Sequence, residues 1–175
     1  MNIEWLSKIL FDEKLAPLRA EELSAVKSFL GEPLTEAEIV TLKDLPDASG
    51  HIKYLDWELP CYTLPDEFIE LLKYSNGNFC NDDREIGLFS LEDFRDYYLL
   101  YMFPEFQPGA IPFGFNGGGT FYAYDLRTIS NSPSIIATSS RVLNWDEAVL
   151  IGHSLEEGFS KSTDIDDEYS SKVVT

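Results

Sequence analysis

Residues 109–127 read GAIPFGFNGGGTFYAYDLR, and this stretch decides the fold class. Two apolar segments, 110–115 and 120–126, flank the run Asn116-Gly117-Gly118-Gly119. A four-residue, glycine-rich connection between such segments is typical of a β-hairpin whose turn needs positive φ. Because side chains alternate along a strand, the second segment presents two faces. One face carries Phe121, Ala123 and Asp125, and the other carries Tyr122, Tyr124 and Leu126.

A helix is predicted ahead of this hairpin, within residues 64–78, which read LPDEFIELLKYSNGN. Pro65 suits the first turn of a helix, where its missing N–H needs no partner. Asp66 and Glu67 follow it, and carboxylates are favourable beside the positive end of the helix dipole. Asn76 and Gly77 tolerate positive φ, so they are expected to end the helix.

The rest of the chain supplies weaker signals. Apolar periodicity predicts helices over residues 3–11 and 20–30, and capping patterns predict further helices after Thr35, Ser90 and Ser154. Short strands are expected over 86–89, 134–138 and 148–151. Consecutive strands joined by short turns form antiparallel sheets. The expected fold class is therefore α+β, with a central antiparallel sheet and helices mainly on one side.

Charge is the most unusual part of the composition. The 175 residues hold 31 Asp and Glu against 13 Lys and Arg, a formal net charge of −18. Such a chain repels nucleic acid and anionic membranes and attracts basic partners. Residues 61–154 alone carry 13 acids and 5 bases, so an acidic face on the folded core is favoured over an acidic appendage. The alternative is that the acidity serves only solubility.

Compartment and cofactor signals are sparse. Cys61 and Cys80 make no disulfide framework and no CxxC, and neither has a histidine at metal-ligand spacing. The start lacks a basic segment and a cleavage site, so no signal peptide is predicted, and no run reaches the apolar length of a membrane span. A cytoplasmic protein with reduced thiols and without metal or other cofactor is expected.

The sequence carries few signals of catalysis. The run of three glycines lacks the Lys-Ser/Thr of a P-loop and precedes a strand instead of a helix, so a structural hairpin is favoured over a phosphate cradle. His51 and His153 have no helical metal-site partner. A Ser–His–Asp triad needs no proximity in sequence, so spacing does not test it, but no nucleophile elbow is present. We expect no enzyme.

Two groups of carboxylates are candidates for binding a partner. Asp125 ends a strand, where it could anchor a basic partner, although a hydrogen bond to the following turn or a pair with Arg127 is favoured. Asp82, Asp83 and Glu85 form either a solvated loop or a binding edge, and the sequence does not separate the two. Aromatic residues are concentrated between positions 94 and 106, and any left exposed beside carboxylates would suit an interface.

A family resemblance rests on the order and spacing of short motifs. They are Leu64-Pro65, Glu67-Phe68, Asn76-Gly77, Gly109, Ile111, Phe113, Gly114, Gly117 to Gly119, Tyr122, Tyr124 to Arg127, and Ser154 to Glu157. In these residues the chain resembles the SUKH superfamily, the fold of many bacterial toxin-immunity proteins and of a fungal cell-wall regulator. It departs from the family pattern in an added acidic loop at 79–85 and in Gly158-Phe159 within the closing helix.

The resemblance implies a non-catalytic α+β domain over residues 35–162, with Pro65, Gly77, Gly114, Gly117, Gly118, Gly119 and Tyr124 as its structural motif. Residues 1–34 would then be a helical extension, and residues 163–175, which lack apolar periodicity, a poorly ordered acidic tail. The implied function is an immunity protein that binds and blocks a basic toxin domain, for example a nuclease. The alternatives are a regulatory or scaffold adaptor of the same fold, and an enzyme or small-ligand binder. The sequence does not indicate an oligomeric state.

Overall fold

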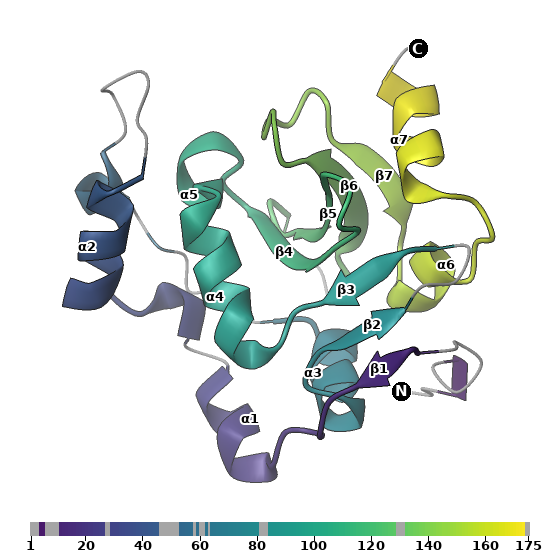
Figure 1. The fold of residues 1–175 in the computed structure, drawn as a ribbon, viewed down its shortest axis with the longest axis horizontal. Coiled ribbons are helices and arrows are strands. Elements are labelled where there is room, and N and C mark those ends of the chain that lie inside the picture. The colour runs from purple at the N-terminus through teal and green to yellow at the C-terminus, as the bar shows by residue number, and fades with distance from the viewer. Residues whose placement is uncertain are drawn as a thin grey trace.

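The computed structural model describes residues 4–5, 11–26, 29–45, 53–57, 59, 62, 64–80, 84–128 and 132–173. In these residues the chain forms a seven-stranded sheet in which each strand pairs antiparallel with the next along the chain. Helices α2, α4 and α5 lie on one side of the sheet in Figure 1, and α6 and α7 lie on the other. The predicted α+β class with an antiparallel sheet is confirmed.

The strands are β1 Glu13–Lys14, β2 Asn78–Cys80, β3 Ile86–Leu88, β4 Ala110–Phe115, β5 Thr120–Asp125, β6 Ser134–Ser139 and β7 Val149–Gly152. The α-helices are α1 Ala20–Val26, α2 Glu36–Lys43, α3 Asp66–Tyr74, α4 Leu91–Leu100, α5 Phe103–Phe106, α6 Leu155–Phe159 and α7 Ile165–Val173. Two 3₁₀ turns, η2 Phe29–Gly31 and η3 Tyr54–Asp56, complete the described elements. The predicted helix over 3–11 lies mostly outside the described residues.

Strand β5 is buried on both faces. Phe121 is fully buried, and its ring packs against Tyr101 of α4 and Phe103 of α5, with ring centroids 4.6 and 5.3 Å away. On the opposite face, Tyr122 packs against Phe159 of α6 and Tyr124 against Phe68 of α3. Helices therefore cover both faces at this strand, whereas the sequence predicted them mainly on one side. The difference arises because β5 has large rings on both faces, so both faces must be shielded from water.

The hairpin between β4 and β5 forms as predicted. Its φ values are positive at Gly117 (75°) and Gly119 (125°), where glycine avoids the steric cost of a side chain. The Asn116 carboxamide oxygen accepts hydrogen bonds from the backbone N–H groups of Gly118, Gly119 and Thr120, which closes the turn. Gly118 has no positive φ; a Cβ there would lie 3.0 Å from an Asp166 carboxylate oxygen, so α7 occupies its space.

Helix α3 also follows its local signals. Pro65 is the N-cap, and the buried stripe is Phe68, Leu71 and Leu72. Gly77 follows the helix with φ at 92°, and a Cβ there would lie 3.1 Å from the backbone N of Ser90. Both the backbone angle and the close approach of β3 therefore require glycine at this position.

The N-terminal segment joins the core, although the sequence predicted a helical extension. Strand β1 pairs with β2 at the edge of the sheet. The buried Arg95 of α4 donates hydrogen bonds to the backbone oxygens of Leu30, Glu32 and Pro33, and to the Glu38 carboxylate with Nε–Oε1 2.6 Å. One buried cation thus ties residues 30–38 to the sheet's helical layer.

The structure of the C-terminal segment differs from the sequence prediction. Residues 165–173 form helix α7, where a poorly ordered acidic tail was predicted. Ile165 is fully buried, Asp166 accepts a hydrogen bond from the Thr120 hydroxyl (2.6 Å), and Glu168 is held by three cations. The helix is stabilised by polar contacts more than by an apolar stripe, which is why apolar periodicity did not reveal it.

Candidate functional site

Asp125 ends strand β5 and is bound by Arg127. Both carboxylate oxygens accept hydrogen bonds from the guanidinium, at 3.0 and 2.8 Å, and one also accepts from the backbone N–H of Arg127. Burial opposes ionisation, but the hydrogen bonds and charge of Arg127 lower the pKa of Asp125 below its ordinary value. The favoured alternative, pairing with Arg127, is what the structure contains, so this carboxylate is already neutralised.

Arg127 in turn lies on an indole ring. Its guanidinium carbon is 3.5 Å from the centre of the Trp145 ring, a cation–π contact. The Trp145 N–H donates to the backbone oxygen of Pro108, at 3.1 Å. Asp125 therefore orients a cation and an aromatic ring at the surface, in place of presenting a free negative charge.

The second group of candidate carboxylates is only partly described. Asp82 and Asp83 lie outside the described residues, and their predicted role remains a prediction. Glu85 is partly exposed before β3, and its backbone oxygen accepts a hydrogen bond from the Tyr122 hydroxyl at 2.9 Å. Its neighbour Arg84 is buried against the α6–α7 segment. Glu85 and Asp125 are thus attached to different parts of the domain.

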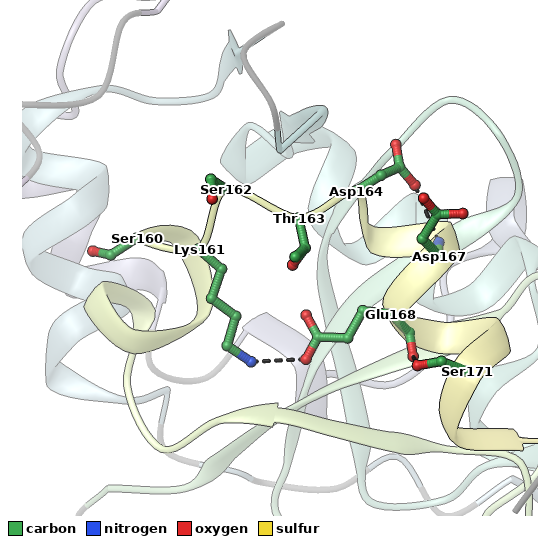
Figure 2. Close-up of a pocket in the computed structure, with 8 residues that line it drawn as sticks. All are labelled: Ser160, Lys161, Ser162, Thr163, Asp164, Asp167, Glu168 and Ser171. Atoms are coloured by element: carbon green, nitrogen blue, oxygen red, sulfur yellow. Dashed lines mark hydrogen bonds and ion pairs between the residues drawn. The ribbon is translucent and has the colours of Figure 1, made fainter.

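An open hollow of about 760 Å³ lies along the α6–α7 connection, between Ser160 and Ser171 (Figure 2). Serine, threonine, lysine and carboxylate side chains line it. Figure 2 shows the ammonium group of Lys161 directed at Glu168. The two groups form an ion pair with 2.8 Å between Nζ and Oε1. This lysine also donates to the backbone oxygen of Ile151, so it is engaged in structure and is not free for chemistry.

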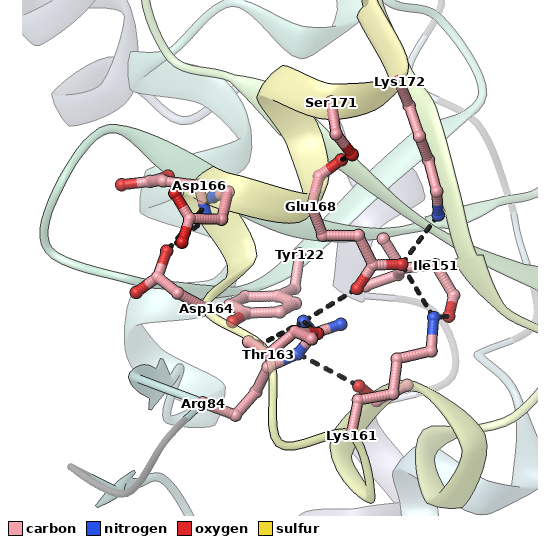
Figure 3. A network of polar contacts seen from close by, with 12 residues as sticks. Arg84, Tyr122, Ile151, Lys161, Thr163, Asp164, Asp166, Glu168, Ser171 and Lys172 are labelled. Atoms are coloured by element: carbon pink, nitrogen blue, oxygen red, sulfur yellow. Dashed lines mark hydrogen bonds and ion pairs between the residues drawn. The ribbon is translucent and has the colours of Figure 1, made fainter.

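Glu168 is the centre of this polar network (Figure 3). The buried Arg84 lies 2.8 Å from one carboxylate oxygen, and Lys161 and Lys172 lie 2.8 and 2.6 Å from the other. Burial alone would raise the pKa of Glu168, but these cations lower it to about 2. A carboxylate that stays ionised is a poor proton donor or acceptor near neutral pH, so the network is suited to holding α7 in place.

The same lysines protect an edge strand. Lys161 and Lys172 donate to the backbone oxygens of Ile151 and Leu150 in β7, the last strand of the sheet. Exposed edge carbonyls are templates for pairing with another chain. The lysines therefore engage two carbonyls of β7, and α7 packs beside the same strand.

The predicted structural motif lies in the core and its turns. Tyr124 is fully buried, and burial beside Glu67 raises the pKa of its hydroxyl well above the ordinary value. Burial also raises the pKa of Glu67, whose carboxylate accepts a hydrogen bond from the backbone N–H of Leu155, at 3.0 Å. A Cβ at Gly114 would lie 3.0 Å from the Gly87 oxygen, so β3 and β4 need glycine to approach. These residues contribute to core packing and to close backbone approach.

The nearest approach to nucleophilic chemistry is a serine–histidine contact. The Ser134 hydroxyl lies 3.2 Å from Nδ1 of His153, at the exposed ends of β6 and β7. Within the described part of the chain no carboxylate bonds the other ring nitrogen, so a triad is not assembled. In the same residues no three His, Cys, Asp or Glu side chains gather into a metal site. His51 and Cys61 are outside the described residues.

Two features of the structure were not predicted from the sequence. Arg84 is a buried organising cation, and a lone arginine in an acidic loop carries no signal of burial. Trp57 and Trp145 come from separate loops, yet both contact the segment 105–108, through Glu105 and Pro108 respectively. The aromatic content of residues 94–106 indicated such a surface, but not its two tryptophans.

A sequence profile of the SMI1 / KNR4 family (SUKH-1) matches residues 50–161. The match covers more than half of the chain and includes α3, the β4–β5 hairpin and α6. The chain therefore belongs to the SUKH-1 family, which confirms the resemblance. Among curated proteins, no similar sequence was found. No helix within the described residues combines the length and apolar character needed to cross a membrane.

Proposed function

We propose that this SUKH-1 domain is a bacterial immunity protein that neutralises a basic toxin domain by binding it directly. The observation that carries the proposal is the net charge of −18 in a domain of this family. The protein would act by binding, without catalysis or a cofactor, in the cytoplasm, where an incoming toxin meets its target.

The arrangement of ion pairs supports this proposal. Three of the described cations, Arg84, Lys161 and Lys172, pair with the single carboxylate of Glu168. These three cations are thus engaged within the domain, and the net charge of −18 suits a partner that binds phosphates with a basic cleft.

The test is neutralisation of a defined toxin. The toxin domain encoded beside the gene of this chain is produced in bacteria with and without the chain, and survival is counted. We expect survival to be restored, and the purified chain to form a one-to-one complex and to inhibit the toxin in vitro. Survival that stays unchanged, together with the absence of a complex, would contradict the immunity function and favour an adaptor.

A further inference from the structure

We propose that the surface formed by Trp57, Glu105, Phe106, Pro108, Arg127 and Trp145 is the docking surface for a basic protein partner that presents apolar side chains beside arginine or lysine. This surface is called the tryptophan surface below. The inference rests on the proposed function, because it names the face through which the domain would hold its toxin.

The tryptophan surface is centred on the short segment that connects α5 to β4. Trp57 donates its indole N–H to the carboxylate of Glu105, at 2.7 Å, and Trp145 donates to the backbone oxygen of Pro108, at 3.1 Å. Phe106 lies between these two contacts in sequence and is 48% exposed. Two indoles from distant loops thus contact the short segment that carries this exposed phenyl ring.

The surface is held rigidly from below. The fully buried Gln107 donates its amide to the backbone oxygen of Asn144 and accepts from the Thr138 hydroxyl, at 3.2 and 2.9 Å. Met102, just before α5, has a left-handed φ of 57°, and its carbonyl accepts from the N–H groups of Glu105 and Phe106. A non-glycine residue in this conformation costs free energy and persists where the surrounding contacts hold it. Preorganised aromatic side chains lose little entropy on binding.

The chemistry of the partner follows from the neighbouring charges. Each aromatic residue has an exposed acid beside it in sequence: Asp56 next to Trp57, Glu105 next to Phe106 and Asp146 next to Trp145. None of the described ion pairs involves these three acids, and the one cation of the surface, Arg127, is neutralised by Asp125. Apolar rings surrounded by unneutralised carboxylates complement a surface of arginine or lysine mixed with apolar side chains. Tryptophan and arginine are also the residue types enriched at binding hot spots.

Other faces of the described domain are less suitable. The β7 edge is occupied by Lys161 and Lys172, and the hollow beside α6 is tied together by Glu168. Arg84 donates to the backbone oxygen of Gly158 in α6, and the backbone oxygen of Glu85 accepts from Tyr122, whose ring packs on Phe159 of α6. Helix α6 lies across the sheet from α5 in Figure 1. Carboxylates there can attract a basic partner over a distance without contacting it.

The experiment compares two substitutions at sites of similar exposure. Phe106→Glu alters the exposed phenyl ring of the tryptophan surface, and Leu15→Glu, at a residue 45% exposed beside β1, is the matched control. Melting curves check that both variants fold. Binding to the purified toxin domain encoded beside this chain's gene is measured by calorimetry. We expect Phe106→Glu to weaken binding at least tenfold and Leu15→Glu to change it less than twofold.

Failure of the inference can be told apart from failure of the proposed function. If the toxin is neutralised by the wild type and equally by Phe106→Glu, or if Leu15→Glu weakens binding as much, the tryptophan surface is not the docking face and the immunity function stands. If the toxin does not bind at all, the immunity function fails, and the surface is tested with a peptide of alternating leucine and arginine. Saturable quenching of tryptophan fluorescence that Phe106→Glu abolishes supports the surface, and its absence overturns it.

Discussion

Arg84, just before β3, and Glu168 of α7 form a buried ion pair. The distance between Nη1 of Arg84 and Oε2 of Glu168 is 2.8 Å. Their side chains are 4% and 11% exposed. Arg84 also donates to the backbone oxygens of Gly158 and Thr163, so one guanidinium holds both ends of the α6–α7 connection. Helix α7 is thus held on the sheet by this ion-pair network together with the buried Ile165.

Glu168→Gln is expected to destabilise the protein by about 3–5 kcal/mol, because it leaves the buried Arg84 without a counter-charge. Urea denaturation measures the change. Glu70→Gln is the control, since Glu70 pairs with Lys73 at the surface and exposed pairs contribute roughly 0–1 kcal/mol. Equal losses in the two variants would show that the Arg84 network does not hold the fold.

Acid should destabilise the protein through the same carboxylate. The pKa of Glu168 is about 2 in the folded protein against an ordinary value of 4.5. Because the folded-state pKa is the lower one, the ionised group stabilises the fold above about pH 4.5, and this contribution is lost as the pH falls from 4.5 toward 2. Melting temperatures measured from pH 7 to pH 2 should fall more steeply for the wild type than for Glu168→Gln. Parallel curves would assign the acid sensitivity to other groups, such as Glu38, whose pKa is also lowered.

The parts of the fold that could be predicted have local causes. Pro65 and Gly77 bound α3, and Gly117 and Gly119 close the hairpin, because each acts through its own backbone angles or its immediate neighbours. The capping box of Thr35 and Glu38 is likewise a contact within one helical turn, and α2 begins there as predicted. Such signals can be interpreted without knowing the tertiary structure.

The parts that were missed depend on distant partners. Strand β1 has two residues and exists because β2 pairs with it, and α7 exists where Glu168 meets Arg84. The tryptophan surface joins residues from four separate segments, and no spacing in the sequence indicates that Trp57 and Trp145 both contact one of them. The Asp125–Arg127 pair could be predicted, because it spans only two positions.

Gly118→Ala tests the contact between the hairpin and α7. A Cβ at this position would lie 3.0 Å from a carboxylate oxygen of Asp166, so that side chain must give way although Asn116 and Thr120 hold it by hydrogen bonds. The variant should therefore lose about 1–2 kcal/mol, as for other overpacked sites. Gly117→Ala should lose a similar amount for a different reason, its positive φ of 75°. Double-mutant cycles with Asp166→Ala separate the two causes. The cost of Gly118→Ala should shrink in that background and the cost of Gly117→Ala should not; an unchanged cost at Gly118 would mean that Asp166 does not occupy its space.

Association kinetics with the toxin domain should separate steering from docking. Exposed charges act over about a Debye length, roughly 8 Å at physiological ionic strength, so raising the salt should slow association more than it speeds dissociation. Replacing Asp82, Asp83 and Glu85 together by Asn, Asn and Gln should slow association if that loop steers the partner. Phe106→Ala should instead speed dissociation, because it removes an apolar contact formed only in the complex. Asp125→Asn should also slow association, because it leaves the cation of Arg127 without its counter-charge on the docking surface for a basic partner. An association rate insensitive both to salt and to the triple substitution would mean that the charge of −18 serves solubility and not recognition.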